Sequence, residues 1–186
     1  MLWSSVTLLA SHDGGTVWRH ALPAPRHIVA AAPFKYDPQW QAPVYRPAAA
    51  FGFRSPSSIV RSRDDDYFYA FITSGWSNGP AAKPVHGQPM GACLIRTVDL
   101  TDPASWRAWN GTSFDVDLAV NPYLDNVVPS EHVCTPLTDM TYISLVYSTF
   151  YRKYMIVGTT GGNDAAGWSM QLADGPLASA SWGPQI

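Results

Sequence analysis

The sequence has little charge and almost no glutamate or lysine. Charged residues make up 14% of the 186 residues, Glu131 is the only glutamate, and lysine occurs only at positions 35, 83 and 153. Lys+Arg 12 against Asp+Glu 14 gives a net charge of -2, and there is no basic tract. Proteins that bind nucleic acid through its phosphates need a basic surface. The composition therefore argues against a nucleic-acid partner, and also against many long surface helices.

Long hydrophobic runs and a cysteine framework are also missing. No apolar run approaches the ~20 residues that a membrane-spanning helix needs, so we expect no membrane partner. The apolar residues 1–10 lack a positively charged start and run into a turn at residues 11–15, which predicts a strand and not a signal peptide. Cys93 and Cys134 are the only cysteines. We expect two buried thiols, with a disulfide as the alternative, and the cellular compartment stays open.

Aromatic residues, glycine and proline are abundant, and they favour an all-β protein. Aromatic residues make up 13% of the chain, which also has 14 glycines and 16 prolines. Short apolar and aromatic runs separated by turn residues are typical of antiparallel strands. The expected strands form three groups, namely residues 2–10 and 16–21; residues 58–62, 67–73, 92–98 and 106–109; and residues 142–147, 153–159, 167–172 and a last piece around Trp182.

The second and third groups share an order of features that is typical of a repeated four-stranded unit. Each contains an apolar strand, a tight turn, an aromatic strand, a glycine-containing loop and a third strand, and then Ser-Trp, at Ser105–Trp106 and at Ser181–Trp182. A period of roughly 50–75 residues is typical of a β-propeller blade with long loops. We predict one incomplete propeller-like domain of about two and a half four-stranded antiparallel blades. Its parts are a half blade (1–21), a Pro-rich connection (22–53) and two blades (54–111 and 135–186).

The segment Ser11-His-Asp-Gly-Gly-Thr-Val-Trp18 resembles the Asp box of sialidase-like propellers, Ser-x-Asp-x-Gly-x-x-Trp. In such a turn the Asp carboxylate and the Ser hydroxyl accept hydrogen bonds from backbone N–H groups. Gly provides the open backbone conformation, and Trp packs under the hairpin. In the families that carry it, the box is a structural staple away from the active site. The resemblance therefore implies an architecture and says nothing of catalysis.

Residues 52–60, 67–71, 93–100 and 105–109 resemble a blade of the five-bladed propeller glycosidases. In that family a Pro-Ser or Pro-Asp pair precedes an aromatic strand, and a strand reading Arg-Thr-x-Asp-Leu follows before a Trp. The resemblance implies a carbohydrate-active protein with a carbohydrate as its partner. Because a closed propeller needs at least about four blades, we expect a homo-oligomer in which two copies complete the ring. A truncated piece of a longer enzyme is the alternative.

Glycosidases of this class use one carboxyl group as an acid and a second as a base or nucleophile. Glu131, with His132 beside it, is the expected catalytic acid, and a solvated loop glutamate is the alternative. The second carboxylate stays open among four candidates, which are Asp37, Asp115, Asp117 and Asp125.

Three further residues are predicted to bind the substrate. Arg54 can pair with an acidic or hydroxylated sugar. In the long segment 74–90, Trp76 can stack on a pyranose ring and His86 can form a hydrogen bond. The sequence has no metal, nucleotide or cofactor motif, so we expect no metal and no cofactor. Glycoside hydrolysis is the first hypothesis; the alternative is a non-catalytic carbohydrate-binding or assembly module, or an inactive propeller fragment.

Overall fold

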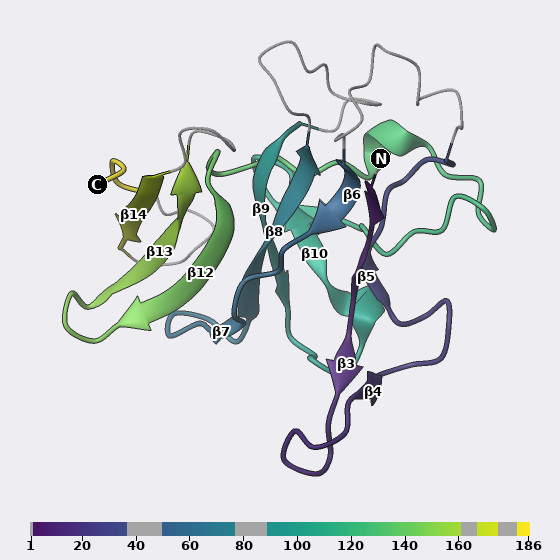
Figure 1. Cartoon of the computed structure of the whole chain (residues 1–186), viewed down its shortest axis with the longest axis horizontal. Helices are drawn as coiled ribbons and strands as arrows, with labels where there is room; N and C mark the ends of the chain where they lie inside the picture. Colours follow the sequence, from purple (N-terminus) through teal and green to yellow (C-terminus); the bar gives the residue numbers. More distant parts are fainter. Residues whose placement is uncertain (1, 37–49, 77–88, 161–166, 175–181) are drawn as a thin grey trace.

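The computed structural model describes residues 2–36, 50–76, 89–160, 167–174 and 182–186. These residues form strands and two short 3-10 helices, η2 (Pro103–Ser105) and η3 (Pro129–Glu131), which confirms the predicted all-β class (Figure 1). The strands belong to four separate sheets, none of which is closed. Within the same ranges, no helix has the length and apolar character needed to span a membrane.

The largest sheet is an antiparallel meander extended at one side by a parallel strand. Its order is β1-β6-β8-β9-β10-β11, and β7 also pairs with β8. The strands are β1 (Leu2–Ser4), β6 (Ala50–Arg54), β7 (Val60–Arg61), β8 (Phe68–Trp76), β9 (Gly91–Thr97), β10 (Arg107–Trp109) and β11 (Phe114–Val116). β1 lies so close to β6 that a Cβ atom on Gly52 would collide with the Ser4 carbonyl oxygen. Gly52 also has a φ of 89°, which favours glycine.

The second sheet consists of β12 (Thr141–Ser148), β13 (Lys153–Thr160) and β14 (Gly167–Ala173), paired in that order. The end of the chain runs beside β14. The Gly183 N–H donates to the Leu172 carbonyl at 2.9 Å, and Met170 and Ile186 exchange two backbone hydrogen bonds. The expected piece around Trp182 is therefore a hydrogen-bonded edge of this sheet and not a regular strand.

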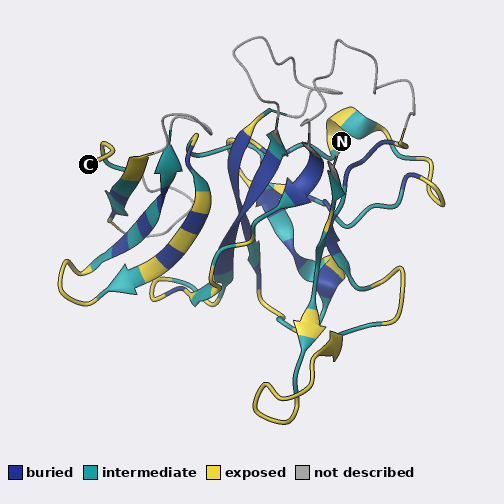
Figure 2. Cartoon of the chain, in the orientation of Figure 1, coloured by how far each residue is buried: buried dark blue, intermediate teal, exposed yellow. Residues whose placement is uncertain are grey.

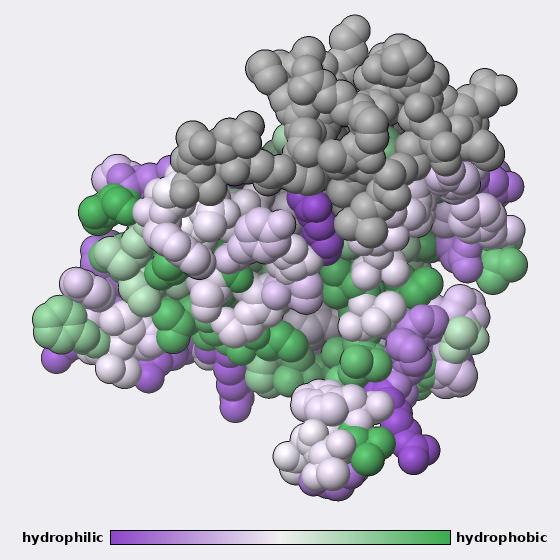
Figure 3. Space-filling view, in the orientation of Figure 1, coloured by the Kyte–Doolittle hydropathy of each residue, from purple (hydrophilic) through white to green (hydrophobic). Residues whose placement is uncertain are grey.

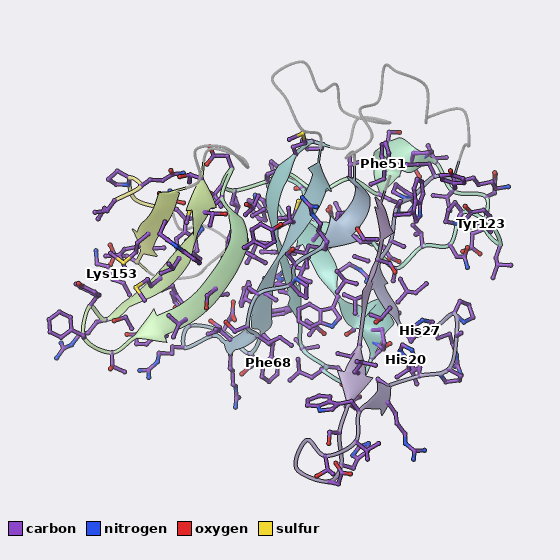
Figure 4. All side chains as sticks on the ribbon, in the orientation of Figure 1. His20, His27, Phe51, Phe68, Tyr123 and Lys153 are labelled. Atoms are coloured by element: carbon purple, nitrogen blue, oxygen red, sulfur yellow. A yellow bond between two sulfur atoms is a disulfide. The ribbon has the colours of Figure 1, made fainter. Side chains whose placement is uncertain are left out.

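The single strand expected over residues 2–10 is wrong, because the structure divides it into three short strands. After β1, β2 (Val6–Thr7) pairs with β5 (Ile28–Ala30), and β3 (Leu9–Ala10) pairs with β4 (Arg19–His20). Each piece therefore has a different partner, which no local pattern in the sequence specifies. The β3–β4 hairpin projects from the body of the molecule (Figure 1). At its base the rings of His20 and His27 lie 4.3 Å apart (Figure 4).

Three strands lie where the sequence predicts none. β5 and β6 fall largely within the Pro-rich stretch 22–53, and β11 extends the first predicted unit beyond residue 111. Proline disfavours a regular element over a whole stretch, but a strand of three residues fits between two prolines. β5 does so, since it lies between Pro25 and Pro33.

Apolar side chains cover both faces of the central strands β8 and β9. On one face, Ile72 and Cys93 belong to a cluster that includes β5 and β10. On the other face, Phe71 and Leu94 pack against the second sheet, whose residues there include Ile156. Figure 2 shows β8 and β9 buried along most of their length, whereas β12 alternates between buried and exposed residues. The two sheets are therefore packed face to face, with β8 and β9 inside.

Cys93 and Cys134 form a disulfide, so the expectation of two free thiols is wrong. Both cysteines are buried, and their Cα atoms lie 6.0 Å apart, a separation that a disulfide spans. The segment after η3 crosses back over the first sheet, where the Thr135 N–H donates to the Trp109 carbonyl at 2.8 Å. This return over β9 brings the cysteines together, and the 41-residue spacing alone does not reveal it.

Candidate functional site

The turn between β3 and β4 is held by its own side chains. Ser11 Oγ accepts from the Gly15 N–H at 2.9 Å, Asp13 Oδ1 accepts from the Val17 N–H at 2.9 Å, and Trp18 Nε1 donates to the Gly15 carbonyl at 3.0 Å. The bond from Val17, together with that from Ser11, lowers the pKa of Asp13. These groups satisfy one another, so the turn has a structural role, although Trp18 remains 60% exposed.

A cleft of about 680 Å³ lies where the β10–β11 turn meets the segment that follows η3. Its polar lining consists of Asn110, Asp115, Ser130, Glu131 and Thr135, and its remaining lining of Pro89, Val116, Val133 and Cys134. The disulfide and the backbone bond from Thr135 to Trp109 hold one wall against the first sheet. The cleft therefore has a fixed wall and two carboxylates.

Asp115 is oriented by two neighbours in the β10–β11 turn. Asn110 Nδ2 donates to Asp115 Oδ1 at 2.7 Å, and Ser113 Oγ donates to Asp115 Oδ2 at 2.9 Å. Asn110 Oδ1 in turn accepts from the Thr112 and Ser113 N–H groups, at 2.7 Å and 2.8 Å. These bonds fix the Asp115 carboxylate at the cleft while its side chain stays exposed.

Glu131 ends the short helix η3 and lines the same cleft. Its side chain is exposed, and within the described part of the chain its carboxylate has no hydrogen-bond or ion-pair partner. The neighbouring His132 is held elsewhere, because its Nδ1 lies 2.7 Å from the Asp117 carbonyl oxygen. A carbonyl oxygen only accepts, so Nδ1 carries the hydrogen. Glu131 is thus the free carboxylate of the cleft.

Of the four candidates for a second carboxylate, Asp115 is the one that shares the cleft with Glu131. Asp117 faces Arg107, whose guanidinium nitrogen lies 3.9 Å from it, and it also accepts from the Ala119 N–H at 2.8 Å. Asp125 accepts from the Asn121 N–H at 3.3 Å, within its own turn. Asp37 lies outside the described residues.

The predicted substrate-binding residues are not gathered around this cleft. Arg54 lies on β6 opposite Thr73 and is absent from the cleft lining. Burial lowers the pKa of Arg54, against a smaller raising influence from Tyr142 on β12. The backbone of Trp76 ends β8, but its side chain lies outside what the structure describes, as does the whole of His86.

The sequence does not single out the neutral polar residues of the cleft, which are Asn110, Ser130 and Thr135. The Asn110-Gly111 pair does signal a tight turn, and an acidic residue five positions later can accept from the turn side chain. Chemically, the cleft can accept hydrogen bonds at Glu131 and donate or accept them at its hydroxyl groups.

No protein-family model matches this chain, and neither a curated protein nor a solved structure matches it. A function is therefore argued from the chain's own residues.

Proposed function

We propose that this chain is a carbohydrate-active protein that binds a sugar in the cleft lined by Glu131 and Asp115. The observation that supports the proposal is that these two carboxylates, from segments 16 residues apart (131 − 115), line one cleft beside hydroxyl and amide side chains. Carboxylate, amide and hydroxyl groups are the partners that sugar hydroxyls need. Pro89, Val116 and Val133 add apolar surface for the C–H groups of a sugar ring.

The lining also favours one class of sugar. Among the residues that the structure describes, the lining holds two carboxylates and no lysine, arginine or histidine. A carboxylate or sulfate on the ligand would meet like charge without a compensating cation. The ligand we propose is therefore a neutral sugar or an amino sugar, which keeps the hydroxylated and not the acidic alternative that Arg54 left open.

Glycosidic-bond hydrolysis is the second candidate, and the shared position of Glu131 and Asp115 favours it. A glycosidase needs an acid on one side of the bond and a base or nucleophile on the other. In this role Glu131 acts in its protonated form, and its carboxyl group donates the proton to the leaving oxygen. Asp115, held by Asn110 and Ser113, acts as base or nucleophile.

The two sheets support a propeller-like arrangement as part of this proposal. Strands β8 to β11 of the first sheet and β12 to β14 of the second are antiparallel meanders, and the two sheets pack face to face through the cluster that includes Phe71, Leu94 and Ile156. Consecutive blades of a propeller pack in the same way. Small-angle scattering of the protein tests this, because a radial and a flat two-layer arrangement give different pair-distance profiles.

The test of function is glycan-array binding followed by titration of the best neutral glycan. We expect Glu131→Gln to weaken binding at least about 10-fold, because a charge-assisted hydrogen bond to a ligand is lost. Asp115→Asn should weaken it by a similar factor. The matched control is Asp125→Asn, an exposed carboxylate outside the cleft, which should bind like the wild type.

Turnover separates the two candidates. Release of phenol from an aryl glycoside, abolished by Glu131→Gln but not by Asp125→Asn, would establish hydrolysis. Binding without release would establish the binding role. If no glycan binds the folded wild-type protein, or if both cleft variants bind as tightly as the wild type, the proposed site is wrong.

A further inference from the structure

One face of the second sheet carries several large apolar residues that no other described element buries fully. On β12, β13 and β14, buried and more exposed residues alternate, so that one set of side chains packs inward and the other points away from the first sheet. The outward set includes six large apolar residues, which define the outer face: Val146, Met155, Val157, Trp168, Met170 and Leu172. A sheet face in contact with water normally has polar residues at these positions.

Strand register places five of these residues in two neighbouring rows. Val146 lies opposite Met155, which lies opposite Leu172. In the next row Val157 lies between Ser144 and Met170, and Trp168 lies beyond it, opposite Thr159. Val146 is 41% exposed and Trp168 is 75% exposed, so the rows reach the surface. In the space-filling view, hydrophobic residues reach the surface in the region of this sheet (Figure 3).

The outer face is electrically neutral. Among the outward positions of these described strands, charge occurs only at Lys153, at the start of β13 (Figure 4). Its ammonium group forms an ion pair with Asp174 at 3.0 Å, and the carboxylate compensates the positive charge. Two copies of such a face can meet without bringing like charges together. A foreign partner, by contrast, would find no charge pattern to recognise.

The size of the outer face fits a weak dimer. Seven residues at ~3.3 Å each give a length of about 23 Å, and three strands plus the edge segment at ~4.8 Å each give a width of about 19 Å. Two such faces would bury roughly 900 Å² together, close to the ~1,000 Å² at which specific interfaces begin. An area of this size is typical of a weak, transient association and not of a permanent complex.

We propose that a second copy of this chain covers the outer face, so that two β12–β14 sheets pack against each other across a twofold axis. Each copy then presents the same residues to the other, as a twofold interface requires. Trp168, which is large and exposed, is the main contact residue.

The first test is sedimentation velocity with the wild-type protein and two lysine variants. The wild type should change from a 20.3 kDa monomer to a species of twice that mass as its concentration rises towards about 1 mM. Val146→Lys should weaken this association at least about 10-fold, because a charge is placed in an apolar contact. Val98→Lys is the matched control, since Val98 is 58% exposed in the turn after β9, and it should associate like the wild type.

The second test needs no substitution and uses the methionines as probes. Met155 and Met170 lie on the outer face, whereas Met90 is 43% exposed near the cleft end of the first sheet. Oxidation by dilute peroxide should slow several-fold at Met155 and Met170 between dilute and concentrated protein, and remain constant at Met90.

Three outcomes would overturn the proposal. The wild type could stay monomeric at every concentration up to about 1 mM, the Kd of a complex worth only ~4 kcal/mol. Val146→Lys could dimerise as well as Val98→Lys. Finally, Met155 and Met170 could oxidise at the same rate at all concentrations; if that rate is slow, another segment of the same chain covers the face.

Discussion

The two main sheets differ in how many of their faces are buried. β8 and β9 of the first sheet are covered on both faces, and nearly every residue of β9 is buried. β12 and β13 of the second sheet are covered on one face, and their burial alternates. A sheet buried on both faces loses its polar alternation, and one covered on a single face should regain it. The second sheet has the alternating burial, but large apolar residues stand at its outward positions beside polar ones such as Ser144 and Thr159.

In the first sheet the apolar residues of the central strands are buried, whereas on the outer face of the second sheet large apolar residues remain partly exposed. In β9, apolar residues such as Leu94 and Ile95 point to opposite faces, and both are buried. In β13, Ile156 is buried and its neighbour Val157 is only partly so. The partly exposed apolar residues of the outer face are those that the proposed second copy would bury. The predictions below test this contrast, beginning with the largest effect.

Removing the disulfide should give the largest loss of stability, because it lies in the doubly buried sheet. Closing a 41-residue loop restricts the unfolded chain, which corresponds to about 4 kcal/mol in the chain-entropy treatment. We expect the double substitution Cys93→Ala and Cys134→Ala to lower the free energy of unfolding in urea by roughly this amount. A reduced wild type should behave like the variant. Free thiols in the unreduced, denatured protein would contradict the prediction.

Truncating Ile156 and Val157, which are neighbours on β13, should cost different amounts of stability because they lie on opposite faces of the second sheet. Ile156→Ala creates a cavity and should lower the free energy of unfolding by about 2–5 kcal/mol, as should Ile72→Ala in β8, a buried reference in the first sheet. Val157→Ala, one position further along, should cost about 1 kcal/mol or less at low protein concentration. Thermal or urea unfolding measures all three. Equal losses at Ile156 and Val157 in dilute protein would show that the outer face is already covered within one chain.

Alkaline pH should destabilise the junction between the sheets through Tyr69. Burial, with a contribution from Asp65, raises the pKa of Tyr69 to about 12, while Arg96 opposes the shift. The folded pKa is above the ordinary value of 10.0, so the contribution of Tyr69 is full below pH 10 and is lost as the pH rises to about 12. Tyr69→Phe should therefore flatten the fall in unfolding free energy between pH 9 and pH 12. Tyr151→Phe, at an exposed tyrosine, should leave that fall unchanged.

The smallest effect is expected at the projecting hairpin, which belongs to neither main sheet. Asp13→Ala removes the acceptor for the Val17 N–H, so exchange of that amide with solvent should accelerate. Because hydrogen bonds lower the pKa of Asp13, the Val17 amide of the wild type should lose its protection only as the pH falls below 3.8. Protection here means the exchange rate relative to the intrinsic rate of an unprotected amide at the same pH. The melting temperature of the body should not change, and His12→Ala is the control. A large drop in melting temperature would mean that the hairpin supports the core.

The strands that the sequence predicted well are those with strong local patterns. The expected strands 67–73, 92–98 and 153–159 differ by at most three residues at either end from β8, β9 and β13. Their aromatic and β-branched residues are continuous enough to show a strand without knowledge of its partners. β1, β2 and β3 were not separated, because the change of partner at Leu8, which bonds to both Ala21 and His27, is a tertiary event.

The candidate site also contains residues that the sequence predicts and residues that only the fold brings together. Glu131 is conspicuous in the sequence because no other glutamate exists, but four aspartates were equal candidates beside it. Asp115 is distinguished by position, since the β10–β11 turn and the segment after η3 meet at one cleft. Asn110 became relevant through its hydrogen bonds to Asp115, which sequence spacing alone does not establish.

Strand propensity and turn hydrogen bonds act over a few neighbouring residues, so the all-β class, the main strands and the residues of the hairpin turn can be predicted from the amino-acid sequence. The disulfide between Cys93 and Cys134, the shared cleft of Glu131 and Asp115, and the face of the second sheet that packs on the first are visible only in the folded molecule. Each of these depends on contacts between segments far apart in the chain, and such contacts are selected by packing of the whole molecule.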